Sequence, residues 1–430
     1  MLSVNQFDPA LVSASRLVVE WLVAESESKS GISMPETYPR PRIPLLPLLS
    51  WRTLFARQTG SCGSTVLDAG RAIDTTSGRA AIAVALKYAG VQAGDKVLVP
   101  AFHCQSMIEP IKAMSAVPVY FRIHEDTSID VEDMRARADG ATRAVIVPHY
   151  FGFPQNMPAI RQFCDTFGLA LIEDCAHAFF GVCHGYPMGW YGDYAIASAK
   201  KFFPVYDGGF LISSRHPLDP ADLEFAGWMF NAKAALNALE YAGSYGRLKV
   251  VYAVLALPIR LQKYLWTKAK SASLTGALAT VGPKVSSGYK YLDTQWINKR
   301  MSGFSRGLIA MTSKAWVVRR RRENYNKLVA ALSDLPKGRP LLPYLPNEVT
   351  PYMFPFLVDE PERVFPRLKR LGVPIYRWEI IEATACDISR SYAQRLLQLP
   401  CHQDLRAKEL DWMIECLKST LTDPEAASNN

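Results

Sequence analysis

Two stretches set the interpretation of this sequence: Ser198-Ala-Lys-Lys-Phe-Phe-Pro-Val-Tyr-Asp-Gly-Gly209 and, upstream of it, Glu173-Asp-Cys-Ala-His-Ala178. Together they offer a small hydroxyl, an amine, a carboxylate that follows an apolar run, and a glycine pair. A cofactor with an aldehyde, a phosphate and a protonatable ring nitrogen needs these groups. The two stretches therefore predict the chemistry of pyridoxal phosphate (PLP).

The composition limits the class of protein. A length of 430 residues exceeds the usual limit of a single hydrophobic core, so we expect one large domain and a smaller one. The formal net charge of +9 would suit an anionic substrate, a membrane surface or nucleic acid. The densest basic run, Arg319–Arg322, is interpreted as a solvated helix face, and no zinc-finger or RNA-binding motif accompanies it. We therefore expect no nucleic-acid partner.

The cysteines and the first residues concern the compartment. The eight cysteines form no Cys-x-x-Cys pair, which argues against a zinc site or a redox dithiol. Residues 1–9 lack the basic region and apolar core of a signal peptide. Both features fit a reduced compartment, so we expect a cytoplasmic protein without a metal.

The longest apolar run is Val250–Leu257, which Pro258 ends. A bilayer span needs about 20 such residues, so the run is too short to cross a membrane. Basic residues flank it, and two interpretations stay open: a helix packed against the protein itself, or an amphipathic helix on a membrane surface.

From residue 76 onward, short apolar runs alternate with helix-length segments. Candidate strands are Lys96–Pro100, Val117–Phe121, Ala144–Pro148, Leu169–Ile172, Ala195–Ser198 and Phe210–Ile212. Candidate helices are Gly78–Gly90, Ser106–Ser115, Ile129–Ala138 and Met157–Phe167. Continuous apolar strands separated by helices predict an α/β fold with a mostly parallel sheet covered on both faces. Ligands bind at the carboxyl ends of such strands, where His149, Asp174 and Ser198 fall.

The chain divides into segments of different character. A long helix over Gly303–Leu332, a strand at Tyr352–Val358 and helices at Pro361–Leu371 and Ala407–Leu417 indicate a smaller α/β domain near the C-terminus. We predict an irregular N-terminal arm (1–75) with a Pro- and Leu-rich strap, a large PLP-binding domain (76–227), an apolar and basic helical insertion (228–283), an interface segment with the long helix (284–335), the small domain (336–422) and a tail (423–430).

Lys201 is the candidate for the amine that bonds the aldehyde. Because Lys200 and Lys201 are adjacent, we expect only one of them to point into the site, and Ser198 precedes Lys201 by three residues. This spacing could put a hydroxyl on the phosphate while the amine of Lys201 reaches the aldehyde. The alternative is that both lysines are solvated, which the apolar neighbours Ile196 and Phe202 disfavour.

Asp174 and His177 are the candidate partners of the cofactor ring. A carboxylate after the apolar run can keep a pyridinium nitrogen protonated, and His177 could contact the ring oxygen or face. The alternatives are a buried structural acid or helix cap and a structural histidine. Ser77-Gly78-Arg79 opens a helix, whose first N–H groups can bind phosphate.

With these residues in place, the chain resembles the DegT/DnrJ/StrS family of sugar aminotransferases, which are fold-type I PLP enzymes. The matching segments follow the family order from about residue 70 to 420. They are Thr76–Arg79, Val99–Cys104, Val147–Gly152, Glu173–Ala178, Met188–Asp193, Ser198–Gly209, Asn298–Met301 and Leu399–His402.

The resemblance implies a role for each matched residue. Lys201 resembles the Schiff-base lysine, Asp174 the pyridinium partner, and His177 a residue beside the cofactor. The expected cofactor-binding set is Ser77, Gly78, Arg79, Cys104, His149, Asp174, His177, Ser198, Lys201 and Asn298. Asn298 resembles an asparagine that reaches the phosphate of a neighbouring protomer, which implies a homodimer with shared active sites. Cys104 stands where the family usually has an aromatic residue on the ring.

The resulting hypothesis is a PLP-dependent aminotransferase. By resemblance, an amino donor, glutamate, would give its amino group to a keto sugar, and a nucleotide-linked sugar would suit the positive chain. One alternative is a PLP-dependent sugar dehydratase, although that branch of the family replaces the lysine that Lys201 resembles. The other is a non-catalytic protein of the same fold that contacts a membrane surface through residues 228–283.

Overall fold

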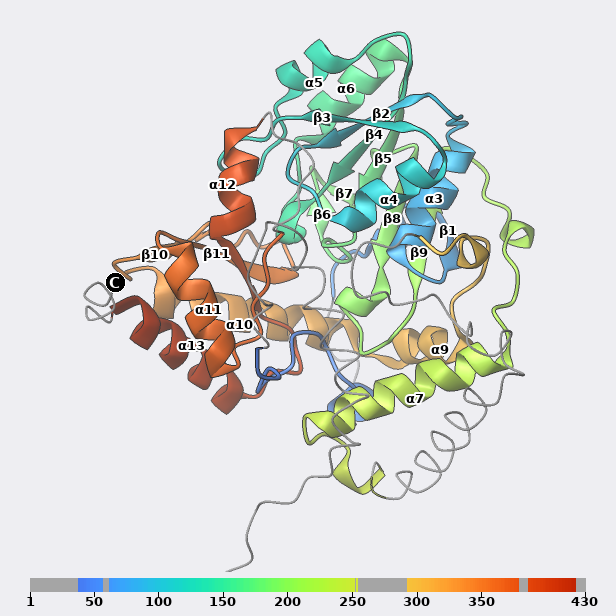
Figure 1. Cartoon of the computed structure of the whole chain (residues 1–430). Coiled ribbons are helices and arrows are strands. Elements are labelled where there is room, and N and C mark those ends of the chain that lie inside the picture. Colours follow the sequence, from blue (N-terminus) through green and yellow to red (C-terminus); the bar gives the residue numbers. More distant parts are fainter. Residues whose placement is uncertain (1–37, 57–61, 252, 254–291, 379–385, 423–430) are drawn as a thin grey trace, which may run out of the picture.

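The computed structural model describes residues 38–56, 62–251, 253, 292–378 and 386–422. These residues form two lobes that lie next to each other in Figure 1, each built on its own β-sheet. A seven-stranded sheet carries the larger lobe and a three-stranded sheet the smaller one. The strands β6 (Val182–Cys183) and β7 (Tyr186–Pro187) form a short separate ribbon.

The large sheet is mostly parallel, as the sequence predicts. Its strands, in spatial order, are β1 (Arg71–Thr75), β9 (Gly209–Ser213), β8 (Tyr194–Ser198), β5 (Ala170–Asp174), β4 (Thr142–Pro148), β2 (Lys96–Pro100) and β3 (Val117–Phe121). Only β9 runs antiparallel to its neighbours β1 and β8 within this sheet. The strands predicted from the apolar runs are confirmed with small shifts of their ends.

Successive residues of the central strands face two different layers of helices. Ile172 of β5 packs with one layer and the preceding Leu171 with the other. The first layer is α3 (Gly78–Tyr88) with α4 (Gln105–Ala113), and the second is α5 (Val131–Arg137) with α6 (Met157–Phe167). Burial on both faces explains why the strands are continuously apolar, and it leaves their carboxyl ends as the accessible edge.

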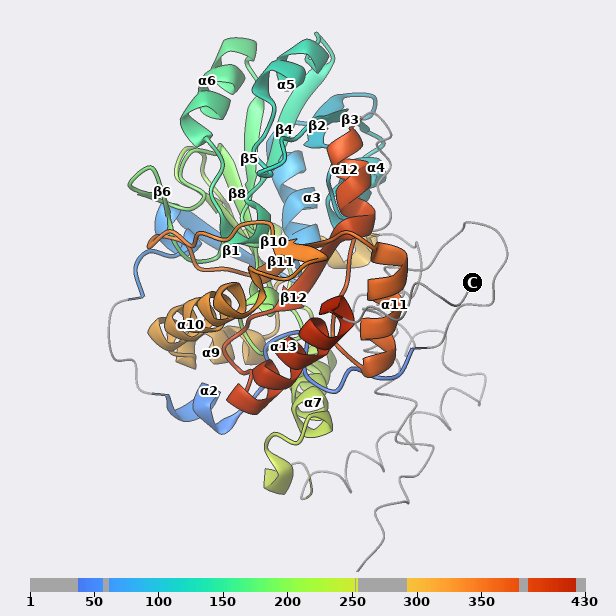
Figure 2. The ribbon, with the colours of Figure 1, turned by 90° about the vertical axis from the view of Figure 1, so that its left-hand side faces the viewer.

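Three helices cover one face of the small antiparallel sheet (Figure 2). The sheet consists of β10 (Gly338–Pro340), β11 (Met353–Val358) and β12 (Leu396–Pro400), and the helices are α10 (Lys314–Leu332), α11 (Pro361–Leu371) and α13 (Ala407–Thr422). Tyr325 and Leu328 of α10 pack there with Phe356 and Leu399 of the strands. A further helix, α12 (Asp387–Arg395), reaches the large lobe, where the Tyr392 hydroxyl donates to the carbonyl of Glu125.

The Pro- and Leu-rich strap joins the two cores. Ile43 is buried in the core of the small lobe, whereas Leu45 and Leu49 are buried in the core of the large lobe. The carbonyl of Pro44 lies 3.0 Å from Nε2 of His402, which follows β12. The strap then enters the short helix α2 (Trp51–Phe55).

The prediction of an irregular arm through residue 75 is wrong at its end. Residues Arg71–Thr75 form β1, which pairs with β9 at one edge of the large sheet. The strand does not form an apolar run in the sequence, because its first two side chains are exposed and only Ile73 and Thr75 are buried. Edge strands are commonly polar on the solvent side.

The prediction of one helix over Gly303–Leu332 is also wrong. The chain forms α9 (Gly303–Met311) and α10, with Thr312 and Ser313 in extended conformation between them. The Thr312 hydroxyl donates to the carbonyl of Leu308, and the Ser313 hydroxyl accepts from the N–H of Trp316. Such side-chain bonds compete with the helix and explain the break.

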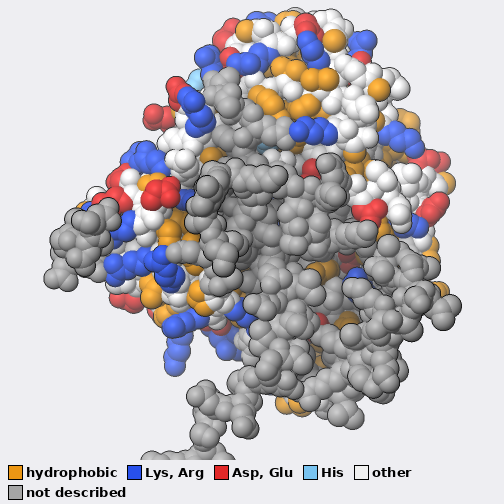
Figure 3. Space-filling view, in the orientation of Figure 1, with side chains coloured by type: hydrophobic (Ala, Val, Ile, Leu, Met, Phe, Trp, Pro, Cys, Tyr) orange, Lys and Arg blue, Asp and Glu red, His pale blue; other side chains and the backbone are white. Residues whose placement is uncertain are grey.

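The predicted solvated face of Arg319–Arg322 needs a correction as well. Arg321 has no exposed surface, because α10 turns this side chain into the junction of the lobes. On the face drawn in Figure 3, basic and acidic side chains are interspersed among the coloured atoms.

Most of the predicted insertion lies outside the described residues. Its described part is mainly α7 (Trp228–Ser244), which packs along α9 in Figure 1. The apolar run Val250–Leu257 falls largely outside them, as does the tail. Among the residues that the structure covers, no helix combines the length and apolarity needed to cross a membrane, and the cysteines are free thiols.

Asp404 is a buried carboxyl group at the junction of the strap and the small lobe. The Ser50 hydroxyl donates to its Oδ1 at 3.1 Å, and Arg247 donates to its backbone carbonyl. Burial raises the pKa of Asp404 to about 7, although Ser50 and Arg247 oppose the shift. Because the folded pKa exceeds the unfolded one, the stabilisation from this group is complete in acid and is lost as pH rises toward 7.

We therefore expect Asp404→Asn to remove this pH dependence. From pH 4 to 7 the wild type should lose up to roughly 4 kcal/mol of unfolding free energy relative to the variant. Urea unfolding at several pH values measures the difference. Asp411→Asn, which changes an exposed carboxylate, should give a curve parallel to the wild type. Parallel curves for Asp404→Asn would contradict the assignment.

Candidate active site

The carboxyl ends of β5 and β8 bring Asp174 and Ser198 beside the start of α3. Side chains two residues apart share one face of a strand. Ile172 and Ile196 pack in the α3–α4 layer, so Asp174 and Ser198 face the same side. A Cβ atom on Gly78, the first residue of α3, would lie 3.2 Å from the Ser198 Cβ. These elements therefore meet at one corner of the sheet.

The start of α3 lies directly on the sheet because of a glycine. Gly209 pairs with Ser198 between β8 and β9, and a Cβ on Gly209 would fall 2.3 Å from the backbone carbonyl of Ser77. The Ser77 hydroxyl caps the helix by accepting from the N–H of Ala80 at 3.1 Å. The first N–H groups of a helix have no partner within it, and with the helix dipole they form an anion site.

Lys201 follows β8 in the 3₁₀ turn η3 (Ala199–Lys201). The next residues, Phe202 and Phe203, are fully buried and direct the chain into the core. Nζ of Lys201 lies 5.2 Å from the centroid of the Tyr352 ring, which belongs to the small lobe. The lysine amine therefore stands between the two lobes, at the corner that Asp174 and Ser198 share.

Asp174 is a buried carboxyl group with little compensation. Burial raises its pKa, while the charge of Lys201 and the N–H of Ala176, which donates to Oδ1 at 2.9 Å, act in the opposite direction. A buried carboxylate whose pKa stays raised is under-neutralised. This carboxylate would gain from a further hydrogen-bond donor or cation.

His177 is a neutral imidazole that completes the same wall. Its ring stacks on Tyr352 with centroids 4.4 Å apart, and its Nδ1 accepts the N–H of Phe151 at 3.3 Å. Burial, and then the charge of Lys201, hold the pKa of His177 well below its usual range. Because Nδ1 is an acceptor, the proton lies on Nε2, which is therefore a donor.

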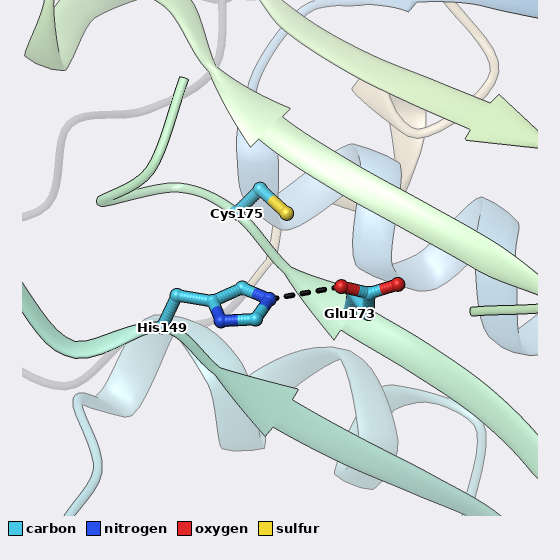
Figure 4. A group of neighbouring side chains, drawn as sticks. All are labelled: His149, Glu173 and Cys175. Carbon is cyan, nitrogen blue, oxygen red and sulfur yellow. Dashed lines mark hydrogen bonds and ion pairs between the residues drawn. The ribbon is translucent and has the colours of Figure 1, made fainter. Parts of the chain in front are cut away.

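His149 faces the other side of the sheet. Figure 4 shows its imidazole pointing at the carboxylate of Glu173, which is adjacent to Asp174 on β5 and so faces the opposite layer. Nε2 of His149 lies 2.9 Å from Glu173, and Nδ1 accepts the N–H of Gln155 at 3.1 Å. Both ring nitrogens are thus engaged away from the corner where Lys201 and Asp174 meet.

His149, Glu173 and Cys175 have ligand-type atoms within 4.8 Å of one another. The imidazole nitrogens are both bonded, and Glu173 also accepts from the N–H of Gly192. Burial raises the pKa of Cys175 well above its usual range, which keeps the thiol protonated. The cluster therefore joins β4 to β5 and leaves no open metal ligand among these three groups.

The remaining predicted residues are Arg79, Cys104 and Asn298. Arg79 is the second residue of α3, and its guanidinium binds Ser106 at 2.7 Å and Glu109 at 2.9 Å on α4. Its backbone N–H is therefore the group that it offers at the start of α3. Cys104 is the half-buried N-cap of α4. Asn298 is exposed.

Sequence reasoning missed the contribution of the small lobe. Tyr352 contacts both His177 and Lys201, and Trp378 lies 5.7 Å from the His177 ring, between centroids. Arg321 donates to the carbonyl of Lys201 at 2.7 Å. Nothing in the sequence distinguishes Arg321 from the other arginines of its basic run. Tyr352 lies next to an apolar strand, where an aromatic residue is expected to pack in the core rather than to line a site.

Comparison with known proteins gives a family match for part of the chain. Residues 64–225 match the DegT/DnrJ/EryC1/StrS aminotransferase family. The chain is 32% identical over 146 residues to GDP-perosamine synthase of Vibrio cholerae, covering 33% of this chain and 40% of that protein. It is 25% identical over 265 residues to L-glutamine:scyllo-inosose aminotransferase of Streptomyces griseus, covering 56% and 62%. The matches thus span less than two thirds of these relatives.

A solved structure extends the likeness of the fold to nearly the whole chain. The putative sugar aminotransferase Spr1654 from Streptococcus pneumoniae, in its PLP form, superposes with a TM-score of 0.58 at 16% identity. The superposition covers 96% of each chain. The expected α/β fold, a large mostly parallel sheet with a smaller domain, is therefore confirmed, and the expected family resemblance is confirmed over residues 64–225.

We expect neutralisation of the two adjacent carboxylates of β5 to shift the melting temperature of the ligand-free protein in opposite directions. Asp174→Asn should raise the melting temperature, increasingly so above pH 4, because it removes a buried charge whose pKa is raised. Glu173→Gln should lower it, because His149 and Gly192 lose a charged acceptor. Thermal unfolding followed by circular dichroism measures both. Equal destabilisation by the two variants would contradict this reading of Asp174.

Proposed function

We propose that this chain, whose residues 64–225 belong to the DegT/DnrJ/EryC1/StrS aminotransferase family, is a PLP-dependent aminotransferase that acts on a keto sugar. The observation that carries the proposal is the convergence of Lys201, Asp174 and His177 with the start of α3. An amine, an under-neutralised carboxylate, a neutral imidazole and an anion site fit the separate groups of one cofactor.

The residues at the corner fit PLP group by group. Asp174 would hold the ring N–H, since its buried carboxylate lacks a strong partner. Ser77, Ser198 and the first N–H groups of α3 would hold the phosphate, at the corner where Gly78 and Gly209 let the start of α3 approach the sheet closely. Lys201 would bond the aldehyde, and Nε2–H of His177 would donate to the ring oxygen.

The protein would contribute orientation and proton transfer. When bound, PLP takes up the amino group of the donor and withdraws electrons from the donor α-carbon. The amine of Lys201, once released, would move the proton from that α-carbon to C4′ of the cofactor as a general base. The Asp174 carboxylate would keep the ring nitrogen protonated, because an adjacent negative charge favours the protonated form. His177 and Tyr352 would exclude water from one side.

Family likeness supports the substrate class. The Vibrio cholerae relative is named for a GDP-linked sugar and the Streptomyces griseus relative for an inosose and L-glutamine. We infer a nucleotide-linked keto sugar as acceptor and glutamate as donor.

The exposed Asn298 would contact the phosphate of a second copy in a homodimer. A monomeric mass in analytical ultracentrifugation of the PLP-loaded chain would refute the homodimer.

The choice of lysine is tested by two neighbouring substitutions. Wild-type protein with PLP should show a visible absorption band that borohydride removes, with the label on the Lys201 peptide. Lys201→Ala should lose the label and at least about 100-fold in transamination, since a positioned general base contributes about this much or more. Lys200→Ala should keep both properties, because it leaves the Lys201 amine and its position beside the Tyr352 ring unchanged.

The same preparations test the substrate. Glutamate should discharge the visible band of wild type, and a keto-sugar nucleotide should restore it faster than a free keto cyclitol does. Glutamine in place of glutamate distinguishes the donors. Full transamination by Lys201→Ala, or a label on another lysine, would refute the mechanism.

A further inference from the structure

Arg321 is an arginine with no exposed surface at the junction of the two lobes. It comes from α10, whose neighbouring Arg319 is 62% exposed. Nε donates to Oε1 of Gln403 at 2.9 Å, and Nη2 donates to the carbonyl of Lys201 at 2.7 Å. Nη1 donates to the carbonyls of Pro351 and Tyr352, each at 3.0 Å.

The charge of this guanidinium is held by neutral oxygens and a ring. The carbon at its centre lies 4.4 Å from the centroid of the Phe202 ring, and the acceptors given above are carbonyl and amide groups. Burial lowers the pKa of Arg321 to about 10, so the side chain remains charged at neutral pH. Burying a charge without a carboxylate partner is costly. The hydrogen bonds of Arg321 must therefore provide something that offsets the cost of burying its charge.

The hydrogen bonds of Arg321 fix the backbone at Lys201, whose amine is the candidate group that bonds the aldehyde. Arg321 binds the carbonyl of Lys201, and Nε2 of Gln403 binds the carbonyl of the next residue, Phe202, at 2.8 Å. The two bonds fix consecutive peptide groups. Farther along, the Asp207 carboxylate accepts from the N–H and hydroxyl of Ser302, which anchors the far end of the turn.

The same guanidinium holds the aromatic ring that the amine faces. Its bond to the carbonyl of Tyr352 fixes the residue whose ring lies 5.2 Å from Nζ of Lys201 and stacks on His177. One planar group thus spans the large lobe, which carries Lys201, and the small lobe, which carries Tyr352. Arginine can do this because its donors lie in a rigid fork, whereas a lysine ammonium is a single point with three donors.

We infer that Arg321 is a positioning residue, which sets where the Lys201 amine stands relative to Tyr352 and so governs its bonding to the PLP aldehyde. This inference rests on the proposed function. In that step the amine nitrogen bonds to the aldehyde carbon and one water leaves. Arg321 touches neither reacting atom; it acts through the Lys201 backbone.

The test uses full-length Arg321→Lys, which keeps the charge and removes the fork, with Arg319→Lys as the matched control on the same helix. PLP retained without a covalent bond is measured by equilibrium dialysis, and bonding is measured by timed borohydride trapping of the Lys201 peptide. We expect Arg321→Lys to retain PLP through the α3 site but to trap at least tenfold more slowly. Arg319→Lys should match wild type in both measurements.

The outcomes separate the inference from the proposed function. If wild type traps PLP on Lys201 and a folded Arg321→Lys does so at the same rate, the positioning role is refuted. If Arg321→Lys does not fold by circular dichroism, Arg321→Met, which removes the donors together with the buried charge, replaces it; slower trapping with retained PLP supports the role, and wild-type trapping refutes it. If wild type itself forms no bond at Lys201, the proposed function fails and the inference falls with it.

Discussion

The alternation of side chains along β5 is the constraint on which the rest of the site depends. Glu173 and Asp174 are adjacent, so the pleat sends one carboxylate to each face of the sheet. Glu173 meets His149 and secures β4 to β5. Asp174 faces the start of α3 without a comparable partner, and burial raises its pKa. One dipeptide thus supplies both a structural hydrogen bond and a buried carboxyl group whose pKa is raised.

The buried carboxyl group of Asp174 and the hydrogen bond from Arg321 to the Lys201 carbonyl complement each other. A protein without ligand bears the cost of a buried carboxylate at Asp174 and of a buried guanidinium at Arg321. The first cost would fall when a protonated ring nitrogen binds. The second cost persists and holds Lys201, Tyr352 and, through it, His177 in a defined relation. The site therefore combines a carboxyl group that is costly to bury without a ligand and a guanidinium whose hydrogen bonds fix the residues around it.

The regular part of this fold could be predicted because its physical signal is local. Buried parallel strands read as continuous apolar runs, and α6 and α11 begin and end where their patterns do. The edge strand β1 lacks that signal because its first residues face solvent. The division into α9 and α10 depends on two hydroxyl groups whose bonds cannot be inferred from composition.

The site likewise contains residues that the sequence predicts and residues that only the packing of the two lobes brings to it. Asp174 and Ser198 end their strands and Lys201 follows the second of them, so topology alone gathers the three residues. His149 also follows a strand end, but its direction depends on the register between strands, which the sequence does not show. Arg321 and Tyr352 come from the other lobe, so their contacts with Lys201 exist only after the lobes pack together. Long-range packing is the part that periodicity cannot supply.

The most direct test of the account is a crystal structure of the borohydride-reduced, PLP-loaded protein. We expect continuous density from Nζ of Lys201 to the cofactor, the Asp174 carboxylate within hydrogen-bond distance of the ring nitrogen, and the phosphate at the start of α3. Density for the cofactor on a different lysine, or a ring nitrogen facing away from Asp174, would contradict it.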